Sequence, residues 1–450
     1  MSGRLFSEAE LKRICQEAVR AAGGEAEAAV DAKTLALTRF ANNVIHQNVA
    51  SREAELRVRV ADGKRVGMVT TNDLSNAGIA RAAAAARDVA QRTPENDTFA
   101  GLPPALPIAN APSAFADRTS SATPLDRATR VEILLRHARE GKLTAAGYLS
   151  TNTYESAVAN SHGVWAYTPS TMAAIETVVM GEGGSAWAER NATDLDRIDV
   201  PSAADEAIGK CVAAKAPRDL APGAYEVVLE TYAVNDIGQF LASVLTGEAV
   251  EEGRSFVGGK IGQKVTGPLT IVDDPFDAEL VPKPFDAEGQ PSQKVTLIAD
   301  GIARAVVYDH QTAARTRNTS TGHALPPNPF QSASPQHLRI EPGTKTRDQL
   351  IREVDRGILV TRFHYTRWVH QLRTIVTGMT RDGTFLIEKG EIAHPVKNFR
   401  FTQSYHEALG GTLGIGRDLQ LFAAGEWTTG QRRVPALRLA SFSFTGATSF

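Results

Sequence analysis

The spacing of apolar residues at the start of the chain changes from a helical period to a strand period. Residues 6–22 carry apolar side chains three or four positions apart behind Ser7, a favourable N-cap, which predicts a helix. In residues 53–60 apolar side chains alternate with Arg57 and Arg59, which is typical of an antiparallel strand with one buried face. The chain therefore begins with a helix and continues with half-buried strands.

The same order of predicted elements occurs twice in the first half of the chain. Strands end at an Asn/Asp-Leu step and are followed by an Ala-rich helix, first at residues 76–92 and again at residues 203–215. Another helix, residues 125–140, starts behind Thr123-Pro124, a pair that suits the N-cap and the first helical position. The repetition predicts an internal duplication, and the alternative is that Asp and Asn simply favour helix starts. The strands expected in this half lie in residues 35–40, 42–49, 53–60, 65–70 and 145–191.

A change of pattern near the middle of the chain predicts a domain boundary. Residues 215–224, KAPRDLAPGA, place two prolines and a glycine between a helix and a strand. We expect an α+β fold with a mixed N-terminal domain, residues 1–218, and a large mainly-β C-terminal domain, residues 219–450. The second domain should contain a helix at 234–244, turns at Arg381-Asp382-Gly383 and Lys389-Gly390, and strands in residues 225–230, 268–275, 293–301, 303–309, 357–363, 374–402 and 434–444.

Composition and charge narrow the classes of partner. The chain is 42% hydrophobic and 22% charged, as ordinary globular proteins are. Its 49 basic and 51 acidic residues nearly cancel, so nothing points to nucleic acid or an anionic membrane. No apolar run approaches the roughly 18 residues of a membrane helix, and the N-terminus lacks an apolar signal core. Cys15 and Cys211 are expected to be buried free thiols of a cytoplasmic protein.

Several long stretches along the chain form a recognisable set. They are TRFANNVIHQNV (residues 38–49) and GKRVGMVTTNDL (63–74) in the first half, and GEAVEEGRSFVGGKIGQKV (247–265), LTIVDDP (269–275) and PFDAEG (284–289) in the second. In sequence and in order, these stretches resemble the TldD/TldE (PmbA) family of metallopeptidases. The form GEAV followed by GRSF is similar to the TldE/PmbA branch. The resemblance implies a two-domain chain that dimerises around a closed peptide channel. In this family TldD-like subunits carry zinc and cleave small or unfolded peptides, whereas TldE-like subunits pair with them without binding metal.

The zinc ligands of the TldD-like members are missing where the resemblance would place them. Those members carry an HExxxH motif on the helix after the first C-terminal strand, but here that helix reads VNDIGQFLASVL and has no histidine. The metal-binding cysteine of the family also lies in the C-terminal domain, and this chain has no cysteine after Cys211. A catalytic zinc needs three protein ligands, a bound water and a carboxylate that accepts its proton. We therefore expect no catalytic residue and no metal ligand in this chain, and zinc in a TldD-like partner.

Other histidine and glycine groups are weaker candidates for chemistry. His406-Glu407 begins like HExxH, but the positions of a second histidine are glycines. His364 and His370 cannot bind one ion from a single strand or helix, although they could line a pocket. The glycines of residues 410–416 lack the strand and helix of a dinucleotide fingerprint, so a loop is expected there.

The sequence leaves three hypotheses for function. The first is a TldE/PmbA-like non-catalytic subunit that forms the peptide channel with a TldD-like zinc peptidase. The second is a homodimeric metallopeptidase with a non-standard metal site made from dispersed residues such as His310, His323 and His364, and the third is a peptide-binding scaffold without catalysis. Each candidate contact residue could instead serve a structural turn or an ion pair within its domain. The candidate substrate-binding residues are Arg254, Ser255, Phe256, Phe285, Asp286, Glu288, Gly289, His310 and His323.

Overall fold

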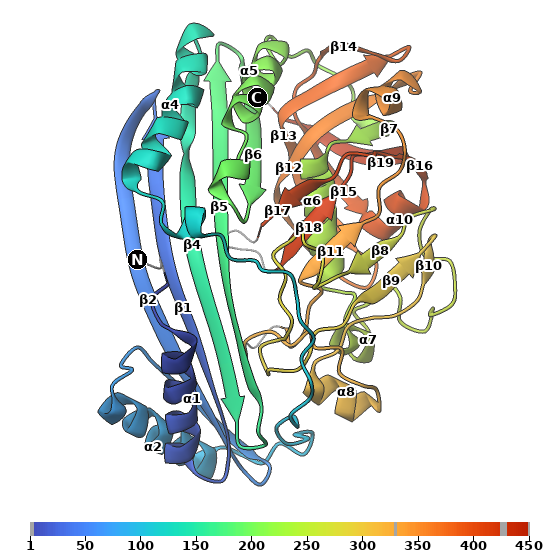
Figure 1. Ribbon diagram of the computed structural model, residues 1–450. Helices are drawn as coiled ribbons and strands as arrows, with labels where there is room; N and C mark the ends of the chain where they lie inside the picture. The colour runs from blue at the N-terminus through green and yellow to red at the C-terminus, as the bar shows by residue number, and fades with distance from the viewer. Residues whose placement is uncertain (1–3, 328–330, 424–429, 449–450) are drawn as a thin grey trace.

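A long antiparallel sheet lies beside a compact β-rich body in the computed structural model of the chain (Figure 1). The structure describes residues 4–327, 331–423 and 430–448. The sheet and its helices come from the first half of the chain, and the β-rich body comes from the second half. The α+β fold class predicted from the sequence is confirmed.

The N-terminal sheet contains six antiparallel strands in the order β3-β2-β1-β4-β5-β6. Its two halves share one order of elements, a helix, three strands joined by hairpins and a second helix, and they meet where β1 pairs with β4. The predicted duplication agrees with this order and stays a prediction. The strands are β1 (Glu25–Ala41), β2 (Val44–Asp62), β3 (Arg65–Thr71), β4 (Thr144–Asn160), β5 (Trp165–Gly181) and β6 (Gly184–Ala192).

The helices of this half begin where local capping signals place them. Helix α1 (Glu8–Ala22) starts with a capping box in which the Ser7 side chain and the Glu10 side chain bond each other's backbone. Helix α4 (Pro124–Glu140) has the same arrangement at Thr123, with proline at its first position. The Ala-rich helices α2 (Asn76–Arg92) and α5 (Val200–Ala213) pack beside α1 and α4 respectively. Two short turns, α3 (Asp117–Ser120) and η1 (Leu195–Arg197), complete this half.

Alternation along the strands gives the sheet two different faces. On β1, Ala26, Ala28 and Val30 belong to the apolar core under α1 and α2. Ala29 points to the opposite face, where it packs with Phe285 of the C-terminal body. The helices therefore cover one face of the sheet, and part of the other face meets the C-terminal body.

A closed ring of five strands forms the centre of the C-terminal body. Strand β12 pairs with β7 and with β13, and β19 and β15 complete the circuit between them. Phe363, Phe401 and Phe442 pack together inside, with ring centroids 4.6 to 5.3 Å apart. The ring strands are β7 (Gly223–Leu229), β12 (Arg356–His370), β13 (Ile375–Glu388), β15 (Phe399–Ser404) and β19 (Leu437–Ala447).

Helix α6 (Thr231–Ala242) packs between this ring and a second sheet of order β10-β9-β8-β11-β18-β17. The strands of the second sheet are β8 (Ile271–Asp273), β9 (Val295–Ala299), β10 (Ile302–Ala303), β11 (His337–Ile340), β17 (Gln420–Phe422) and β18 (Gln431–Val434). The remaining elements are α7 (Gly247–Glu251), α8 (His310–Thr316), α9 (Arg347–Arg352), α10 (Tyr405–Gly410), β14 (Glu391–Pro395) and β16 (Thr412–Ile415).

Three local predictions for the C-terminal half are wrong. Asp382 and Gly383 form a bulge inside β13 instead of a turn, because their positive φ angles of 57° and 119° interrupt the pairing register without reversing the chain. Residues 304–309 leave the sheet after β10, and the short strand β16 occupies residues that were expected to form a loop. The Lys389-Gly390 turn is confirmed, with both residues at positive φ between β13 and β14.

Two further observations concern the cysteines and the helices. Cys15 and Cys211 are free and buried, as predicted, and burial raises the pKa of the Cys15 thiol to about 12. Among the helices of the described residues, none is both long enough and apolar enough to cross a bilayer.

Candidate functional site

A cleft of about 410 Å³ separates the open face of the N-terminal sheet from the C-terminal body. Its sheet side is a small polar patch, in which Tyr154 lies opposite Ser170 and Ser156 lies opposite Thr168 on β4 and β5. These four residues share a face because side chains two positions apart point the same way. The C-terminal body contributes Val281, Pro282, Lys283, Gln336, His337 and Gln431.

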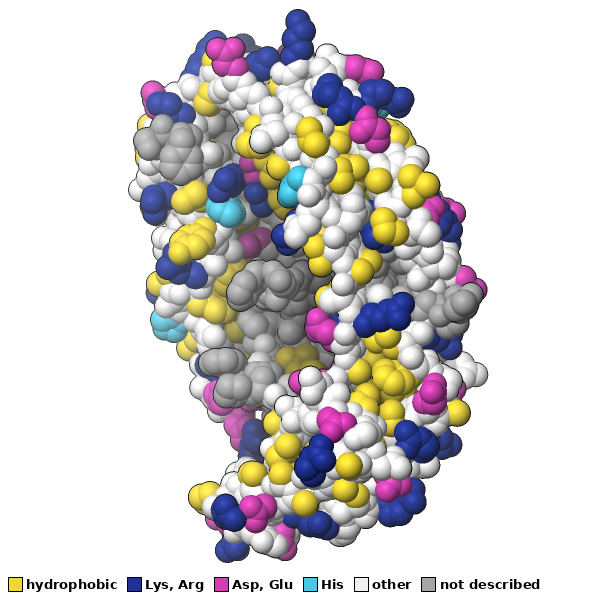
Figure 2. Space-filling model, turned by 90° about the vertical axis from the view of Figure 1, so that its left-hand side faces the viewer, with side chains coloured by type: hydrophobic (Ala, Val, Ile, Leu, Met, Phe, Trp, Pro, Cys, Tyr) yellow, Lys and Arg dark blue, Asp and Glu magenta, His cyan; other side chains and the backbone are white. Residues whose placement is uncertain are grey.

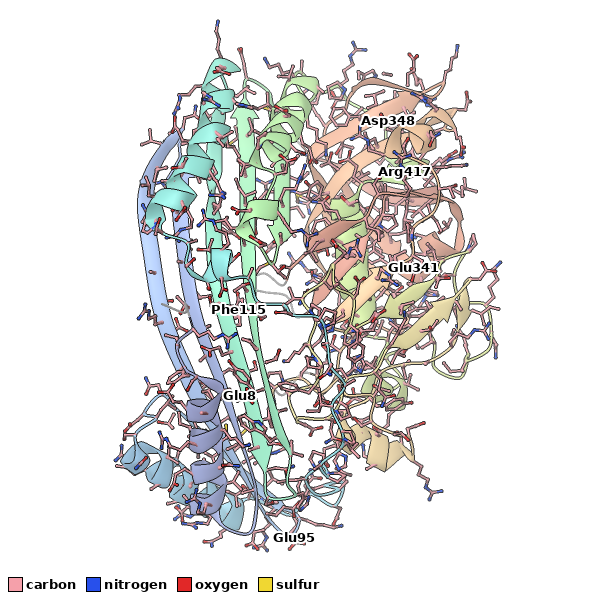
Figure 3. The ribbon with its side chains drawn as sticks, viewed as in Figure 1. Glu8, Glu95, Phe115, Glu341, Asp348 and Arg417 are labelled. Atoms are coloured by element: carbon pink, nitrogen blue, oxygen red, sulfur yellow. The ribbon has the colours of Figure 1, made fainter. Side chains whose placement is uncertain are left out.

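An extended segment runs along one side of this cleft. Ala114 pairs with Ser170 of the cleft wall, and the next residue, Phe115, stacks against Arg4 with the guanidinium carbon 4.4 Å from the ring centroid (Figure 3). Earlier in this segment, the carbonyls of Pro103 and Pro104 accept hydrogen bonds from Asn160 and Gln290. The proline-rich segment is extended, and it bridges the two halves of the chain.

Asp273 is the centre of a buried polar cluster behind the cleft. Its Oδ2 lies 2.8 Å from His323 Nε2, and its Oδ1 accepts the backbone N–H of His337 at 2.7 Å. Burial alone would raise the pKa of Asp273, but His323 and His337 hold that pKa below its usual value. His337 Nε2 lies 3.1 Å from the Val281 carbonyl oxygen, which positions the ring at the cleft. The sequence predicted a role for His323 but missed Asp273 and His337.

The residues of the PFDAEG stretch form the contact between the two halves. Phe285 packs on Ala29, Val158 and Ala166 of the sheet. Asp286 accepts three backbone N–H groups at 2.9 Å, from Glu288, Gln290 and Ala324, which fixes the turn. Burial raises the pKa of Asp286 to about 6. These contacts give the PFDAEG turn a structural role, because they fix its shape and pack it on the N-terminal sheet.

Glu288 contacts the N-terminal sheet through Arg59 of β2. Its Oε1 lies 3.5 Å from Arg59 Nη2, and the same nitrogen donates to Glu27 at 2.8 Å. Glu288 Oε2 accepts the backbone N–H of His310 at 3.1 Å. Burial raises the pKa of Glu288 to about 8 despite the opposing charge of Arg59, and the nearby Asp286 adds to the rise. Sequence reasoning missed Arg59 as a partner, because the contact joins residues far apart in the chain.

The other candidate residues lie after α7. Arg254 Nε donates to Glu252 at 2.6 Å, and Arg254 also pairs with Glu248. Ser255 and Phe256 are buried, and the Phe256 ring stacks on His406 with centroids 5.0 Å apart. None of these three residues is among those that line the cleft. Their role in substrate contact stays a prediction.

Helix α6 carries a buried acid that the sequence analysis did not single out. Asp236 accepts hydrogen bonds from Tyr405 at 2.7 Å and Thr366 at 2.6 Å, and burial raises its pKa to about 6. The preceding residue, Asn235, accepts Arg432 Nε at 2.6 Å. The signal in the sequence was the pair Asn-Asp within a mostly apolar helix. The side chains of Asn235 and Asp236 are therefore occupied by partners within the chain.

Two carboxylates face each other across β5 and β6. Glu176 and Glu189 are register partners, and the Tyr148 hydroxyl donates to Glu176. Burial and the neighbouring Glu176 raise the pKa of Glu189 to about 7. Sequence reasoning could have found this pair, because the two residues lie at equal distances from the Glu182-Gly183 turn that joins the strands.

A model of the PmbA/TldA metallopeptidase C-terminal domain matches residues 222–446, and a model of domain 1 of the same family matches residues 26–90. The chain belongs to the PmbA/TldD metallopeptidase family. The matched C-terminal region contains the five-stranded ring, α6 and the second sheet.

Full-length relatives place the chain on the PmbA/TldE side of this family. It is 24% identical to the metalloprotease PmbA of Escherichia coli O157:H7, over 93% of this chain and 94% of that protein. The fold is similar to the crystal structure of TldE from Thermococcus kodakarensis, with a TM-score of 0.89 and 20% identity over 97% of this chain and 100% of that one. A putative modulator of a DNA gyrase from Thermotoga maritima has the same fold, with a TM-score of 0.85 and 16% identity over 97% of this chain and 100% of that one.

The histidines proposed for a dispersed metal site have different surroundings in this PmbA/TldE-like chain. His323 is bonded to Asp273 and Thr321, His310 begins α8 beside Glu288, and His364 lies on β12. Within residues 4–327, 331–423 and 430–448, no three His, Cys, Asp or Glu side chains are grouped in a way that could hold a metal ion.

Proposed function

We propose that this chain is the non-catalytic subunit of a peptidase whose zinc-bearing subunit is TldD-like. The observation that carries the proposal is the composition and packing of α6. In the TldD-like members the corresponding helix presents histidines and a glutamate to zinc, whereas this helix has no histidine and uses Asn235 and Asp236 for contacts with Arg432, Tyr405 and Thr366. A chain built this way contributes structure and substrate contacts while the partner supplies the metal-bound water.

The cleft between the sheet and the C-terminal body is the proposed contact surface for an unfolded peptide. Its sheet side presents the hydroxyl groups of Tyr154, Ser156, Thr168 and Ser170, each of which can donate and accept hydrogen bonds. Such a surface binds the main chain of an extended peptide without selecting its sequence. The partnership would operate in the cytoplasm, where both cysteines remain reduced.

Reconstitution with a TldD-like subunit tests the proposal. The chain alone, purified without chelator, should contain far less than one zinc per chain and should not cleave an unstructured peptide. A one-to-one mixture with a TldD-like subunit should cleave it, and replacing the glutamate of that subunit's HExxxH motif should abolish cleavage. Stoichiometric zinc and chelator-sensitive cleavage by the chain alone would refute the proposal and favour a homodimeric metallopeptidase.

Two variants test whether the cleft contributes to peptide cleavage by the reconstituted mixture. Thr168→Val removes a cleft hydroxyl at constant shape, and we expect it to raise KM severalfold with little change in kcat, because the partner retains the chemistry. Thr402→Val removes an exposed hydroxyl on β15 and is the matched control. Equal KM values for both variants would show that the cleft does not hold the peptide.

A further inference from the structure

Lys283 places a positive charge without a counter-ion at the wall of the cleft. It is the one lysine or arginine among the described residues that line the cleft, and no aspartate or glutamate is found among them. Its side chain is half-buried, and within residues 4–327, 331–423 and 430–448 it makes no ion pair and no hydrogen bond. A free ammonium group therefore borders a surface that otherwise consists of hydroxyl, amide and apolar groups.

Two acids of the same loop have other partners. Asp274 pairs with Lys294 at 2.8 Å. Asp277 pairs with Arg339 of β11 at 2.5 Å. The loop therefore supplies counter-ions to cations on neighbouring segments and supplies none to its own Lys283. This arrangement leaves the ammonium group available to an anion from outside the chain.

The main chain around Lys283 is held in place on both sides. Pro282 and Pro284 fix their own φ angles, and a proline also favours an extended conformation in the residue before it. The backbone N–H of Lys283 donates to the Pro275 carbonyl at 3.1 Å. The Pro284 carbonyl accepts the backbone N–H of Ser292 at 2.9 Å. A ligand that binds the ammonium group therefore does not have to order the loop that carries it.

The charge of Lys283 also acts on the buried cluster behind the cleft. Burial lowers the pKa of His337, and the Lys283 ammonium lowers it further, against the opposing charge of Asp273. The ammonium group must lie near the His337 ring to have this effect, and that ring lines the same cleft. His337 is neutral near pH 7 and adds no second cation.

The charge of the molecule as a whole does not provide a general attraction for anions. The 49 basic and 51 acidic residues nearly cancel. Figure 2 shows one face of the molecule, on which basic and acidic side chains are interspersed with apolar ones and no large patch of one sign is visible. Anion binding at the cleft must therefore depend on the individual cation that lines it.

The cleft and its ammonium group together favour one chemical group of a peptide. The hydroxyl groups on the sheet side suit a main chain of any sequence, and the carboxylate that does not depend on sequence is the C-terminal one. We propose that Lys283 binds the C-terminal carboxylate of a peptide held in the cleft. The inference rests on the proposed function in one respect, that the cleft holds an unfolded peptide. It makes the substrates peptides with a free C-terminus.

Peptide binding to the purified chain tests the proposal without the zinc-bearing subunit. The probe is a short peptide of glycine, serine and alanine with a fluorophore at its N-terminus, made either with a free C-terminal carboxylate or with a C-terminal amide. By fluorescence anisotropy the wild-type chain should bind the carboxylate form about tenfold more tightly, because amidation removes a charge-assisted hydrogen bond. Added salt should reduce this preference.

Three variants assign the preference to the ammonium group. Lys283→Met removes the charge from a side chain of similar length and should abolish the preference for the carboxylate form. Lys283→Arg keeps a cation and should retain most of it. Lys215→Met removes an exposed ammonium group just after α5, outside the cleft, and is the matched control that should leave the preference unchanged.

The outcomes separate this proposal from the proposed function. A wild-type chain that binds both peptides equally or binds neither, or a Lys283→Met chain that keeps the full preference, overturns the proposal. An amidated peptide with one internal glutamate that binds through Lys283 as tightly as the free C-terminus would assign the ammonium group to acidic side chains, and would also overturn it. Failure of the mixture with a TldD-like subunit to cleave would refute the subunit role while the binding preference remained measurable.

Discussion

At the contact between the halves of the chain, both the backbone conformation and the limited space around residue 289 require a glycine. Its φ angle is +71°, which side-chain-bearing residues rarely adopt. A Cβ atom at this position would lie 2.5 Å from Cγ1 of Val164, at the start of the β4–β5 hairpin's return strand. The absence of a side chain therefore lets the turn of residues 285–289 lie directly on the sheet.

Gly289→Ala should destabilise the contact by more than the backbone strain alone. We expect a cost of about 1 kcal/mol from the positive φ angle and about 1 to 3 kcal/mol more from displaced packing. The matched control is Gly253→Ala, because Gly253 has a φ of +69° with no atom near the added Cβ. Urea unfolding of both variants measures the difference. Equal shifts would show that the contact with Val164 adjusts freely.

The buried acid Glu288 makes the stability of the same contact depend on pH. Its pKa in the folded chain, about 8, lies above the value of an unfolded glutamate, so the folded state binds the proton more tightly. The stabilisation is complete below pH about 4 and is lost as the pH rises toward 8. Glu288→Gln, which resembles the protonated form, should flatten the urea-midpoint profile between pH 5.5 and 8.5. An unchanged slope in this variant would show that Glu288 is not responsible.

At the scale of elements, the bulge in β13 ties the ring of strands to the N-terminal sheet. Asp382, at positive φ within the bulge, accepts Arg362 Nε at 2.6 Å and the Ser185 hydroxyl at 2.8 Å. Ser185 belongs to β6, so one carboxylate joins β12, β13 and the other half of the chain. A regular strand at this position would direct the side chain elsewhere.

Asp382→Ala should destabilise the chain by about 3 to 5 kcal/mol, because it leaves the largely buried guanidinium of Arg362 without its carboxylate. Asp382→Asn keeps a side chain that tolerates positive φ and an oxygen that can accept from Ser185, so its loss should be smaller. Thermal unfolding of the two variants compares them. If both lose the same stability, the charge of Asp382, and not its shape or its bond to Ser185, holds the contact.

How well the sequence predicted each element depended on whether the cause was local. The starts of α1 and α4 could be predicted because Ser7 and Thr123-Pro124 act on backbone groups within one turn. The full lengths of β1 and β2 could not be predicted. Residues 46–50 of β2 are exposed on both faces, and residues 25–34 of β1 are mostly alanine and charged residues, which strands disfavour. The bulge at Asp382 resembled a hairpin turn because both use the same residue types.

At the scale of the whole molecule, the candidate site depends on contacts between distant parts of the chain. The sequence resemblance predicted the family and drew attention to residues 285–289, but it did not show that Arg59 and Val164 would meet them. The cleft likewise takes its walls from β4 and β5 and from residues 281–283 and 336–337. The residues that line the cleft therefore show no common spacing in the sequence, because each group of them follows the pattern of its own strand or loop.

The closed ring of the C-terminal body has a consequence for the order in which the protein folds during synthesis. Strand β7 is the first ring strand to leave the ribosome, and one of its neighbours, β19, is the last ring strand to be made. The N-terminal sheet pairs mostly neighbouring hairpins and can assemble while translation continues. The ring cannot close before β19 is made. Until then, β7 and α6 expose the apolar side chains that are buried in the finished core. Chaperone demand should therefore concentrate on the second half of the nascent chain.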